Sequence, residues 1–305
     1  MFFERFFARC ARFAIPRFLM GSDLRRRIKN LSGCVPPWER KRRKRSRPVE
    51  PWAFIRAHNE ARTLGQTLNS IEGVITRGVI GLHGITDDTD VLVSDFCSRN
   101  KGFTVFHYPH SVVPPGDPRY ASGGVPYLNS FAAFTNAVWE QIPDNEWAIL
   151  IDADMVYHPG LLKDSFYLPS GTGDMVSYSR LNLVRVNGDI RVIEYCRPGD
   201  HWLIYKTPST RFVGEGVNRR EKIDVGIEVL LKGKKNIISP ECSSIHFPYE
   251  KSWKSFPEGR ETVDLSHFLS KMPAWEIDKT IWTPTLIRKI YNLYELKDYN
   301  VTSVF

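Results

Sequence analysis

Two aspartates separated by one alanine follow an apolar run in AILIDADMVYHPG, residues 148–160. Such a run is typical of a buried strand, and strand alternation places Asp152 and Asp154 on one side with Ala153 on the other. Carboxylates this close repel each other unless a hard divalent cation lies between them. A cation held by few protein ligands keeps positions open for phosphate oxygens. The pair therefore predicts a metal–diphosphate site, and a solvated turn after a strand is the simpler alternative.

The elements that position this pair follow a regular alternation. Short apolar runs predict strands at residues 52–57, 77–84, 103–108 and 147–151. Helical patterns separate them at residues 58–71, 86–99 and 128–142. Asn59 is expected to cap the first helix, and residues 109–127 form a long Pro/Gly-rich loop. This order predicts an α/β fold with a mainly parallel sheet covered on both faces. Ligands of such sheets bind beyond the carboxyl ends of the strands, where the two aspartates lie.

Basic residues are concentrated at the N-terminus. The chain of 305 residues has a net charge of +8. Residues 1–50 contain fifteen Lys/Arg and four Asp/Glu, a net of +11, so the remaining 255 residues carry −3. By charge, the body is therefore not a nucleic-acid-binding surface. Five cysteines at irregular spacing form no disulfide framework, which fits a reducing cytosol.

The first residues predict an amphipathic helix that ends near Pro16, with phenylalanines on one face and arginines between them. The arginines exclude a signal peptide, and no segment is apolar enough to span a bilayer. A second basic block, RKRRKR, occupies residues 40–45. We expect both to bind an anionic membrane surface. The alternatives are a helix packed on its own domain beside a solvated charge run, and nuclear targeting or RNA binding.

The segments RAHNEARTLGQTLNSI, TDDTD and LIDAD together resemble the nucleotide-sugar-binding half of GT-A glycosyltransferases, particularly the inverting glycosyltransferase family 2. The family's later motif is E-D-x-D, then Gly, then Pro seven residues on and His six after that. Here Glu221 to Asp224 precede Gly233, Pro240 and His246 with that spacing. The resemblance covers roughly residues 51–250 and implies a GT-A (Rossmann-like) fold, a nucleotide-sugar donor and Mn²⁺ or Mg²⁺.

The resemblance also implies roles for individual residues. Around the donor it implies a nucleobase and ribose pocket at Ala57, His58 and Glu60, a base contact at Asp87 or Asp88, and a ribose or sugar contact at Asp152. Asp154 would bind the metal, and His246 would complete the metal site or lie beside the diphosphate. Imidazole suits Mn²⁺ better than Mg²⁺. Lys251 would neutralise charge on the leaving group.

The catalytic base is where the sequence departs from the family. An inverting transferase needs a carboxylate to take the proton of the acceptor hydroxyl, and the family's Asp is replaced by Lys222. Glu221 is the first candidate and Asp224 the second, with Asp200 and Glu215 as further carboxylates suited to a sugar site. Trp202 is expected to stack on the acceptor. The segment 246–253, HFPYEKSW, is similar to some retaining GT-A enzymes, so stereochemistry stays open, with inversion favoured.

These features predict three regions: a basic membrane-associating extension and linker (1–50), a GT-A catalytic domain (51–255) and a helical tail (256–305). The catalytic domain divides into a nucleotide-sugar half (51–155) and an acceptor half (156–255). A helix at 286–296 would pack on the sheet or form a homodimer contact.

The expected activity is metal-dependent transfer from a nucleotide sugar, with UDP-sugar favoured, to a lipid-linked or membrane-held glycan of lipopolysaccharide or capsule. The protein would lie peripherally on the cytoplasmic face of the inner membrane. A non-catalytic membrane-surface scaffold is the alternative, because of Lys222. A sugar-nucleotidyltransferase is disfavoured, because AHNEAR lacks the glycines of a phosphate loop.

Overall fold

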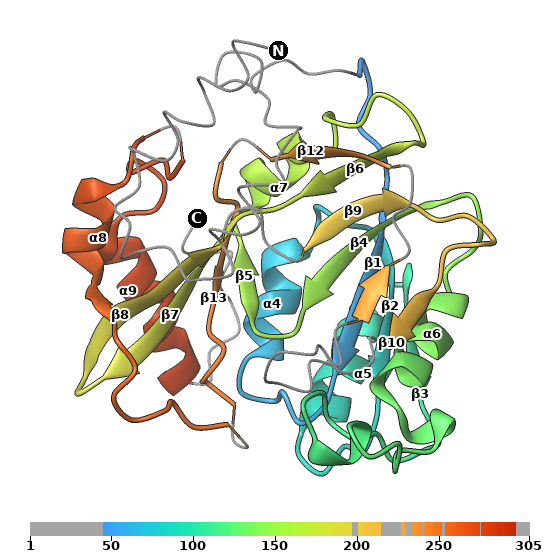
Figure 1. Cartoon of the computed structure of the whole chain (residues 1–305). Coiled ribbons are helices and arrows are strands. Elements are labelled where there is room, and N and C mark those ends of the chain that lie inside the picture. Colours follow the sequence, from blue (N-terminus) through green and yellow to red (C-terminus); the bar gives the residue numbers. More distant parts are fainter. Residues whose placement is uncertain are drawn as a thin grey trace.

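The computed structural model describes residues 45–196, 201–214, 227–229, 234–239, 241–251, 254–274 and 276–296. The strands of its main sheet are β1 (Trp52–Ala57), β2 (Arg77–Leu82), β3 (Phe103–His107), β4 (Trp147–Asp152), β6 (Asp174–Ser177), β9 (Trp202–Tyr205) and β12 (Lys235–Ile238). Their order is β12-β6-β9-β4-β1-β2-β3 (Figure 1). All neighbours pair in parallel except at β9, which is antiparallel to both β4 and β6. The predicted α/β fold with a mainly parallel sheet is therefore confirmed.

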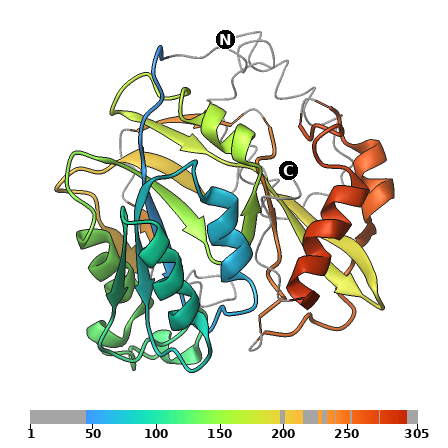
Figure 2. The ribbon, with the colours of Figure 1, turned by 180° about the vertical axis from the view of Figure 1, so that it is seen from behind.

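Helices cover both faces of this sheet. The strands and helices of the N-terminal half appear from behind in Figure 2, where α4 (Leu64–Ile71) and α5 (Thr89–Arg99) lie over one face. The other face is covered by α6 (Phe131–Glu140). Side chains of β1 alternate between the two layers: Ile55 shares a buried cluster with α4 and α5, whereas Phe54 packs edge-on against Trp139 of α6. Because both faces are covered, the strands are apolar at nearly every position.

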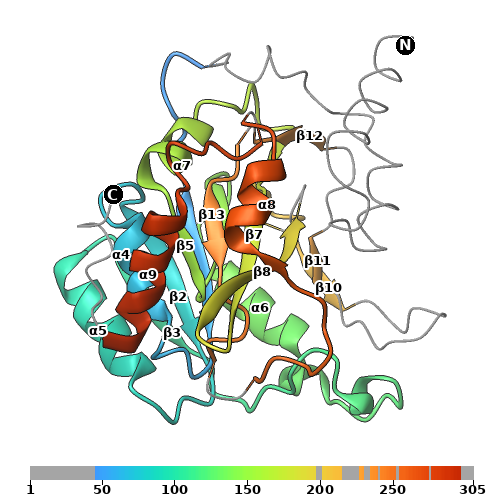
Figure 3. The same cartoon turned by 90° about the vertical axis from the view of Figure 1, so that its left-hand side faces the viewer.

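A smaller sheet lies beside the main one. Its strands are β5 (Met155–Tyr157), β7 (Arg180–Val186), β8 (Asp189–Cys196), β13 (Ser244–His246) and β14 (Val263–Asp264), in the order β14-β8-β7-β13-β5. Helices α8 (Leu265–Lys271) and α9 (Pro284–Leu296) lie over it (Figure 3). Ile287, Ile290 and Tyr291 of α9 are buried in its core. Of the two roles considered for this helix, packing on a sheet is the one observed.

The remaining elements connect these layers. They are α7 (Pro159–Ser165), the 3₁₀ turns η2 (Pro118–Tyr120) and η3 (Tyr127–Asn129) in the long loop, and the strand pair β10 (Phe212–Gly214) and β11 (Ile227–Val229). Within the described residues, no helix has the length and apolar character needed to cross a membrane. The predicted N-terminal helix and most of the block at 40–45 lie outside the described residues.

The predicted cap of the first helix is wrong. This helix begins at Leu64, five residues beyond Asn59. Asn59 instead adopts a φ of 51°, and its side chain accepts a hydrogen bond from the Thr86 amide at 2.8 Å and donates one to the Thr86 hydroxyl at 2.9 Å. Asparagine tolerates this left-handed conformation better than most residues do. Asn59 therefore ties the loop after β1 to the loop after β2.

Candidate metal and nucleotide site

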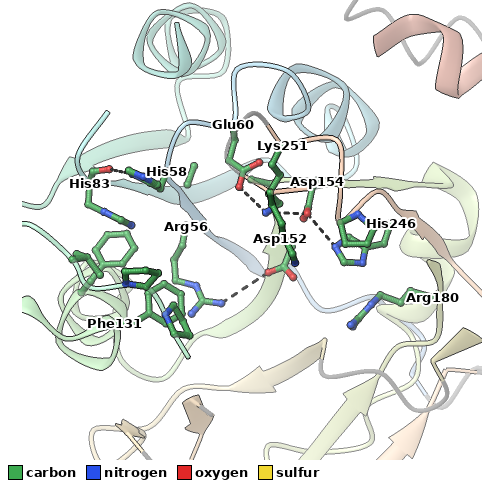
Figure 4. A pocket seen from close by; sticks show the side chains of 18 residues that line it. Arg56, His58, Glu60, His83, Phe131, Asp152, Asp154, Arg180, His246 and Lys251 are labelled. Carbon is green, nitrogen blue, oxygen red and sulfur yellow. Dashed lines mark hydrogen bonds and ion pairs between the residues drawn. The ribbon is translucent and has the colours of Figure 1, made fainter. Parts of the chain in front are cut away.

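A cavity of about 480 Å³ lies at the carboxyl ends of β1, β2 and β4 (Figure 4). His58 follows β1, His83 follows β2, and Asp152 ends β4. The smaller sheet contributes Arg180 from β7 and His246 from β13. The cavity therefore draws its side chains from both sheets, at the edge where ligands of open α/β folds bind.

Three of the lining residues form a candidate metal site. One ligand atom from each of Asp152, Asp154 and His246 lies within 4.8 Å of the other two. Asp154 is 2% exposed, and its Oδ2 lies 3.1 Å from His246 Nε2. Burial opposes the ionisation of Asp154, but His246 in its protonated form and Lys251 outweigh it and hold the pKa of this carboxyl well below its ordinary value. Asp154 is therefore an anion available to a cation.

The hydrogen bonds of His246 leave its Nε2 available as a ligand. Arg180 Nε donates to Asn182 Oδ1 at 3.1 Å, which identifies that atom as the amide oxygen. The same oxygen lies 2.9 Å from His246 Nδ1, so Nδ1 must be the donor. Burial also lowers the pKa of His246 and favours the neutral ring. Nε2 then presents a lone pair to an anionic carboxylate, an arrangement that a divalent cation between them would stabilise. The donor set fits Mn²⁺ or Mg²⁺.

Asp152 is oriented by a different histidine. Arg180 Nη1 lies 2.7 Å from His201 Nδ1, so Nδ1 accepts and Nε2 carries the proton. His201 Nε2 donates to Asp152 Oδ2 at 2.8 Å, and Arg56 Nη2 lies 3.9 Å from Oδ1. No local pattern in the sequence indicates that Arg56, Arg180 or His201 belongs to this site. All three reach the site through pairing between strands that are distant in sequence.

Lys251 links the acid pair to the loop after β1. Its Nζ donates to Glu60 Oε1 at 2.7 Å and lies 3.0 Å from Asp154 Oδ2. Burial would lower the pKa of Lys251, but these two carboxylates raise it, so the ammonium stays charged. Burial raises the pKa of Glu60 to about 7, and its attraction to Lys251 partly offsets that rise. The site therefore holds a fixed positive charge beside the candidate metal ligands.

The other end of the cavity is aromatic. The rings of His58 and His83 stack 4.6 Å apart with 4° between their planes, and His83 meets Phe134 edge-on at 4.6 Å. Burial, followed by repulsion from His58, lowers the pKa of His83 to about 4. Neither ring nitrogen of His83 has a hydrogen-bond partner among the described residues, although the residue is only 9% exposed. This neutral donor–acceptor group suits the edge of a planar heterocycle.

Most of the predicted donor-side residues meet in this cavity: Ala57, His58, Glu60, Asp152, Asp154, His246 and Lys251. His83 was missed, although its position directly after a predicted strand places it on the same edge. Asp87 and Asp88 do not line the cavity. Asp87 accepts hydrogen bonds from the amides of Ala61 and Thr89 and so joins the two loops.

The expectation that Trp202 stacks on an acceptor sugar is wrong. Trp202 is 7% exposed, and its ring packs among those of Phe54, Trp139 and Phe212 in the core beneath α6. The remaining predicted acceptor and base residues, Asp200, Glu215, Glu221 and Asp224, lie outside the described residues.

Comparison with known proteins identifies a family to which the chain is similar. The model of the family described as Beta-1,4-N-acetylgalactosaminyltransferase (CgtA) matches residues 33–230. No curated protein sequence matches the chain.

Similarity to solved structures is distant. Glucosyl-3-phosphoglycerate synthase from Mycobacterium tuberculosis, solved with Mg²⁺ and UDP, is 16% identical over 48% of each chain, with a TM-score of 0.28. Mannosyltransferase PcManGT from Pyrobaculum calidifontis, solved with GDP-Man and Mn²⁺, is 16% identical over 47% of this chain and 41% of its own, with a TM-score of 0.31. A mycobacterial protein is 15% identical over 70% of this chain and 69% of its own, with a TM-score of 0.38. The chain thus spans about half the length of the first two.

Proposed function

The chain belongs to the family described as beta-1,4-N-acetylgalactosaminyltransferase (CgtA), and from this premise we propose that it is a metal-dependent glycosyltransferase that uses a nucleotide-sugar donor. N-acetylgalactosamine is the first sugar to test, and UDP the first nucleotide. The observation that carries the proposal is the convergence of Asp152, Asp154 and His246 at the carboxyl edge of the main sheet.

The proposed donor lies along the cavity. The nucleobase stacks at the aromatic end, where His83 offers a neutral ring edge and His58 a face. The diphosphate reaches Asp152, Asp154 and His246, which would hold Mn²⁺ or Mg²⁺. When bound, this ion acts as a Lewis acid that stabilises negative charge on the diphosphate.

Lys251 adds a second positive charge at the same place. Its ammonium lies 3.0 Å from Asp154. It can therefore neutralise the negative charge that develops on the diphosphate as it leaves. The proton of the acceptor hydroxyl needs a separate carboxylate. We propose Glu221 for that role, with Asp224, Asp200 and Glu215 as the other candidates on the acceptor side.

The stereochemistry and the acceptor belong to the same proposal. The family description names a β linkage, and forming it from an α-linked nucleotide sugar requires inversion. A retaining reaction is the alternative.

We propose a glycan held at a membrane surface as acceptor, in lipopolysaccharide or capsule synthesis. The support is the basic N-terminal region, which would place the protein peripherally at the cytoplasmic face of the inner membrane.

The first test is thermal unfolding of the purified protein with UDP, GDP or CMP, each with and without Mn²⁺. A nucleotide at one hundred times its Kd should stabilise the fold by about 2.7 kcal/mol. We expect the stabilisation with UDP to require Mn²⁺, to disappear in Asp154→Ala, and to persist in Asp95→Ala, a control at an exposed aspartate. If no nucleotide stabilises the protein, the assignment of Asp152 and Asp154 to a metal–diphosphate site is wrong.

A scaffold that keeps the fold but lacks catalysis is the second candidate, because Lys222 occupies the position of the catalytic Asp in glycosyltransferase family 2, which the sequence resembles. Turnover of UDP-N-acetylgalactosamine separates the two candidates. A scaffold would bind nucleotide with Mn²⁺ and release no UDP in the presence of any acceptor glycan.

A further inference from the structure

A buried acid precedes the site lysine directly. Glu250 is 7% exposed and has partners on both carboxylate oxygens. The Tyr291 hydroxyl donates to Oε1, and Arg62 Nη2 lies 2.6 Å from Oε2. Arg62 belongs to the loop after β1 that carries Glu60, and Tyr291 belongs to α9. One carboxylate therefore joins three segments that are distant in sequence.

The contact with α9 is the more enclosed of the two. Tyr291 is 1% exposed, its ring meets Phe247 edge-on at 5.0 Å, and the Arg185 guanidinium lies 4.7 Å from its centre. Arg62 has a half-exposed side chain, so solvent screens its charge. Burial and the nearby Glu250 both raise the pKa of Tyr291, which keeps the hydroxyl protonated as a donor.

The turn between Phe247 and Lys251 is therefore held at both of its ends. The Phe247 amide donates to the Asp154 carbonyl at 3.0 Å, and the Glu250 amide donates to the Phe247 carbonyl at 3.1 Å. Lys251 follows at once and places its ammonium between Glu60 and Asp154. A lysine side chain has a flexible four-carbon stem, so its position depends on the backbone that carries it.

We propose that Glu250 and Tyr291 are positioning residues that hold Lys251 at the diphosphate. Through Tyr291, α9 then affects the site without lining it. The proposal rests on the proposed function for the role of Lys251. Without the Tyr291 hydroxyl, Glu250 Oε1 is left buried without its donor, and the turn gains freedom at the point where Lys251 begins. The effect should appear in the donor site, although α9 contributes no residue to the cavity lining.

Tyr195→Phe is a matched control for Tyr291→Phe. Tyr195 is also 1% exposed, lies in the same core, and has its hydroxyl 3.0 Å from another buried acid, Glu276. Both variants lose one hydroxyl next to a buried carboxylate, so both should lower the melting temperature. Only Tyr291→Phe should weaken Mn²⁺-dependent UDP binding, by about two- to tenfold.

A double-mutant cycle identifies the route of the effect. In a Lys251→Met background, Tyr291→Phe should cause no further loss of UDP affinity, because the group it positions is gone. Equal losses in Tyr291→Phe and Tyr195→Phe, or an undiminished loss in the Lys251→Met background, would overturn the proposal. If Tyr291→Phe does not fold, Glu250→Gln takes its place in the cycle.

Hydrogen exchange separates this proposal from the proposed function. Tyr291→Phe should accelerate exchange of the Phe247 and Glu250 amides, and Tyr195→Phe should leave both unchanged relative to the rest of the chain. If the wild-type protein binds no nucleotide, the proposed role of Lys251 at a diphosphate is wrong. Hydrogen exchange then still tests whether the contact with α9 holds the turn. Unchanged exchange at both amides would show that α9 does not hold the turn.

Discussion

At the scale of single residues, two histidines contact the two aspartates through opposite tautomers. His201 carries its proton on Nε2 and donates it to Asp152, whereas His246 carries its proton on Nδ1 and turns a lone pair toward Asp154. Arg180 sets both arrangements, because it can only donate. Asp152 thereby accepts a hydrogen bond from its histidine, whereas Asp154 has the Lys251 ammonium on one side and a histidine lone pair on the other, where a divalent cation would fit.

His83 should make the stability of the protein depend on pH. Its ordinary pKa of 6.5 falls to about 4 in the folded chain, because burial and His58 both oppose protonation. Below pH 6.5 the unfolded chain binds a proton that the folded chain refuses, so the free energy of unfolding falls as the pH drops toward 4 and then levels. The loss should be about 2 kcal/mol. Urea unfolding between pH 7 and 4 measures it.

Two variants isolate this contribution from that of the other acids. His83→Gln should show a smaller loss of stability than the wild type over that pH window. His267→Gln, at an exposed histidine of α8, should retain the wild-type loss. An unchanged pH profile in His83→Gln would contradict the burial of a neutral imidazole at this place.

The sequence predicted part of this residue-scale detail. Asp152 and Asp154 followed from a strand pattern, and the resemblance placed His246 and Lys251. The sequence did not predict His83, His201 or Arg180 as site residues, because no local pattern indicates them. Their roles depend on which strands become neighbours. Trp202 was assigned wrongly for the same reason. A tryptophan near an acidic residue gives the same sequence pattern whether its ring stacks on a sugar or packs against Phe54 in the core.

At the scale of elements, β2 and α6 approach each other so closely that only glycine fits between them. A Cβ on Gly81 would lie 2.1 Å from Val138 Cγ2. Gly81→Ala must therefore displace the Val138 side chain or α6 itself, and overpacking of this kind costs about 1–3 kcal/mol. Gly171→Ala is the control, because a Cβ there would meet nothing within 4 Å. Urea unfolding of both variants measures the difference, and equal stabilities would contradict the observed packing.

The first four strands and the three helices between them could be predicted, because each has a strong local pattern. The strand pairs beyond residue 155 could not. They are short, and β9 is a four-residue strand that inserts antiparallel between β4 and β6. Nothing in WLIY indicates direction or partner, since both are set by contacts with strands far away in sequence.

At the scale of the whole molecule, the charge separation between the first 50 residues and the body predicts salt-sensitive membrane binding. The full chain should sediment with vesicles rich in phosphatidylglycerol and not with phosphatidylcholine vesicles. Neutralising the six basic residues of Arg40–Arg45 should weaken binding by at least about tenfold, since each contributes on the order of 1 kcal/mol near such a surface. Raising the salt should have a similar effect.

The control for this prediction removes charge from the body. Lys101 and Lys163 lie on the main domain, outside the basic region. Replacing both by glutamine should leave vesicle binding unchanged. Equal binding to both kinds of vesicle, or no loss on neutralising Arg40–Arg45, would contradict attachment through the basic region.

The site also has a consequence for how the protein is made. A ribosome delivers β1 to β4 first, and with them the aromatic end of the cavity and both aspartates. His246 and Lys251 emerge later, with β13 of the second sheet and directly after it, and the tyrosine of α9 emerges last. During synthesis the nascent chain therefore contains both aspartates and the aromatic end of the cavity before His246 and Lys251 are added. By this order, the proposed donor site is completed only near the end of synthesis.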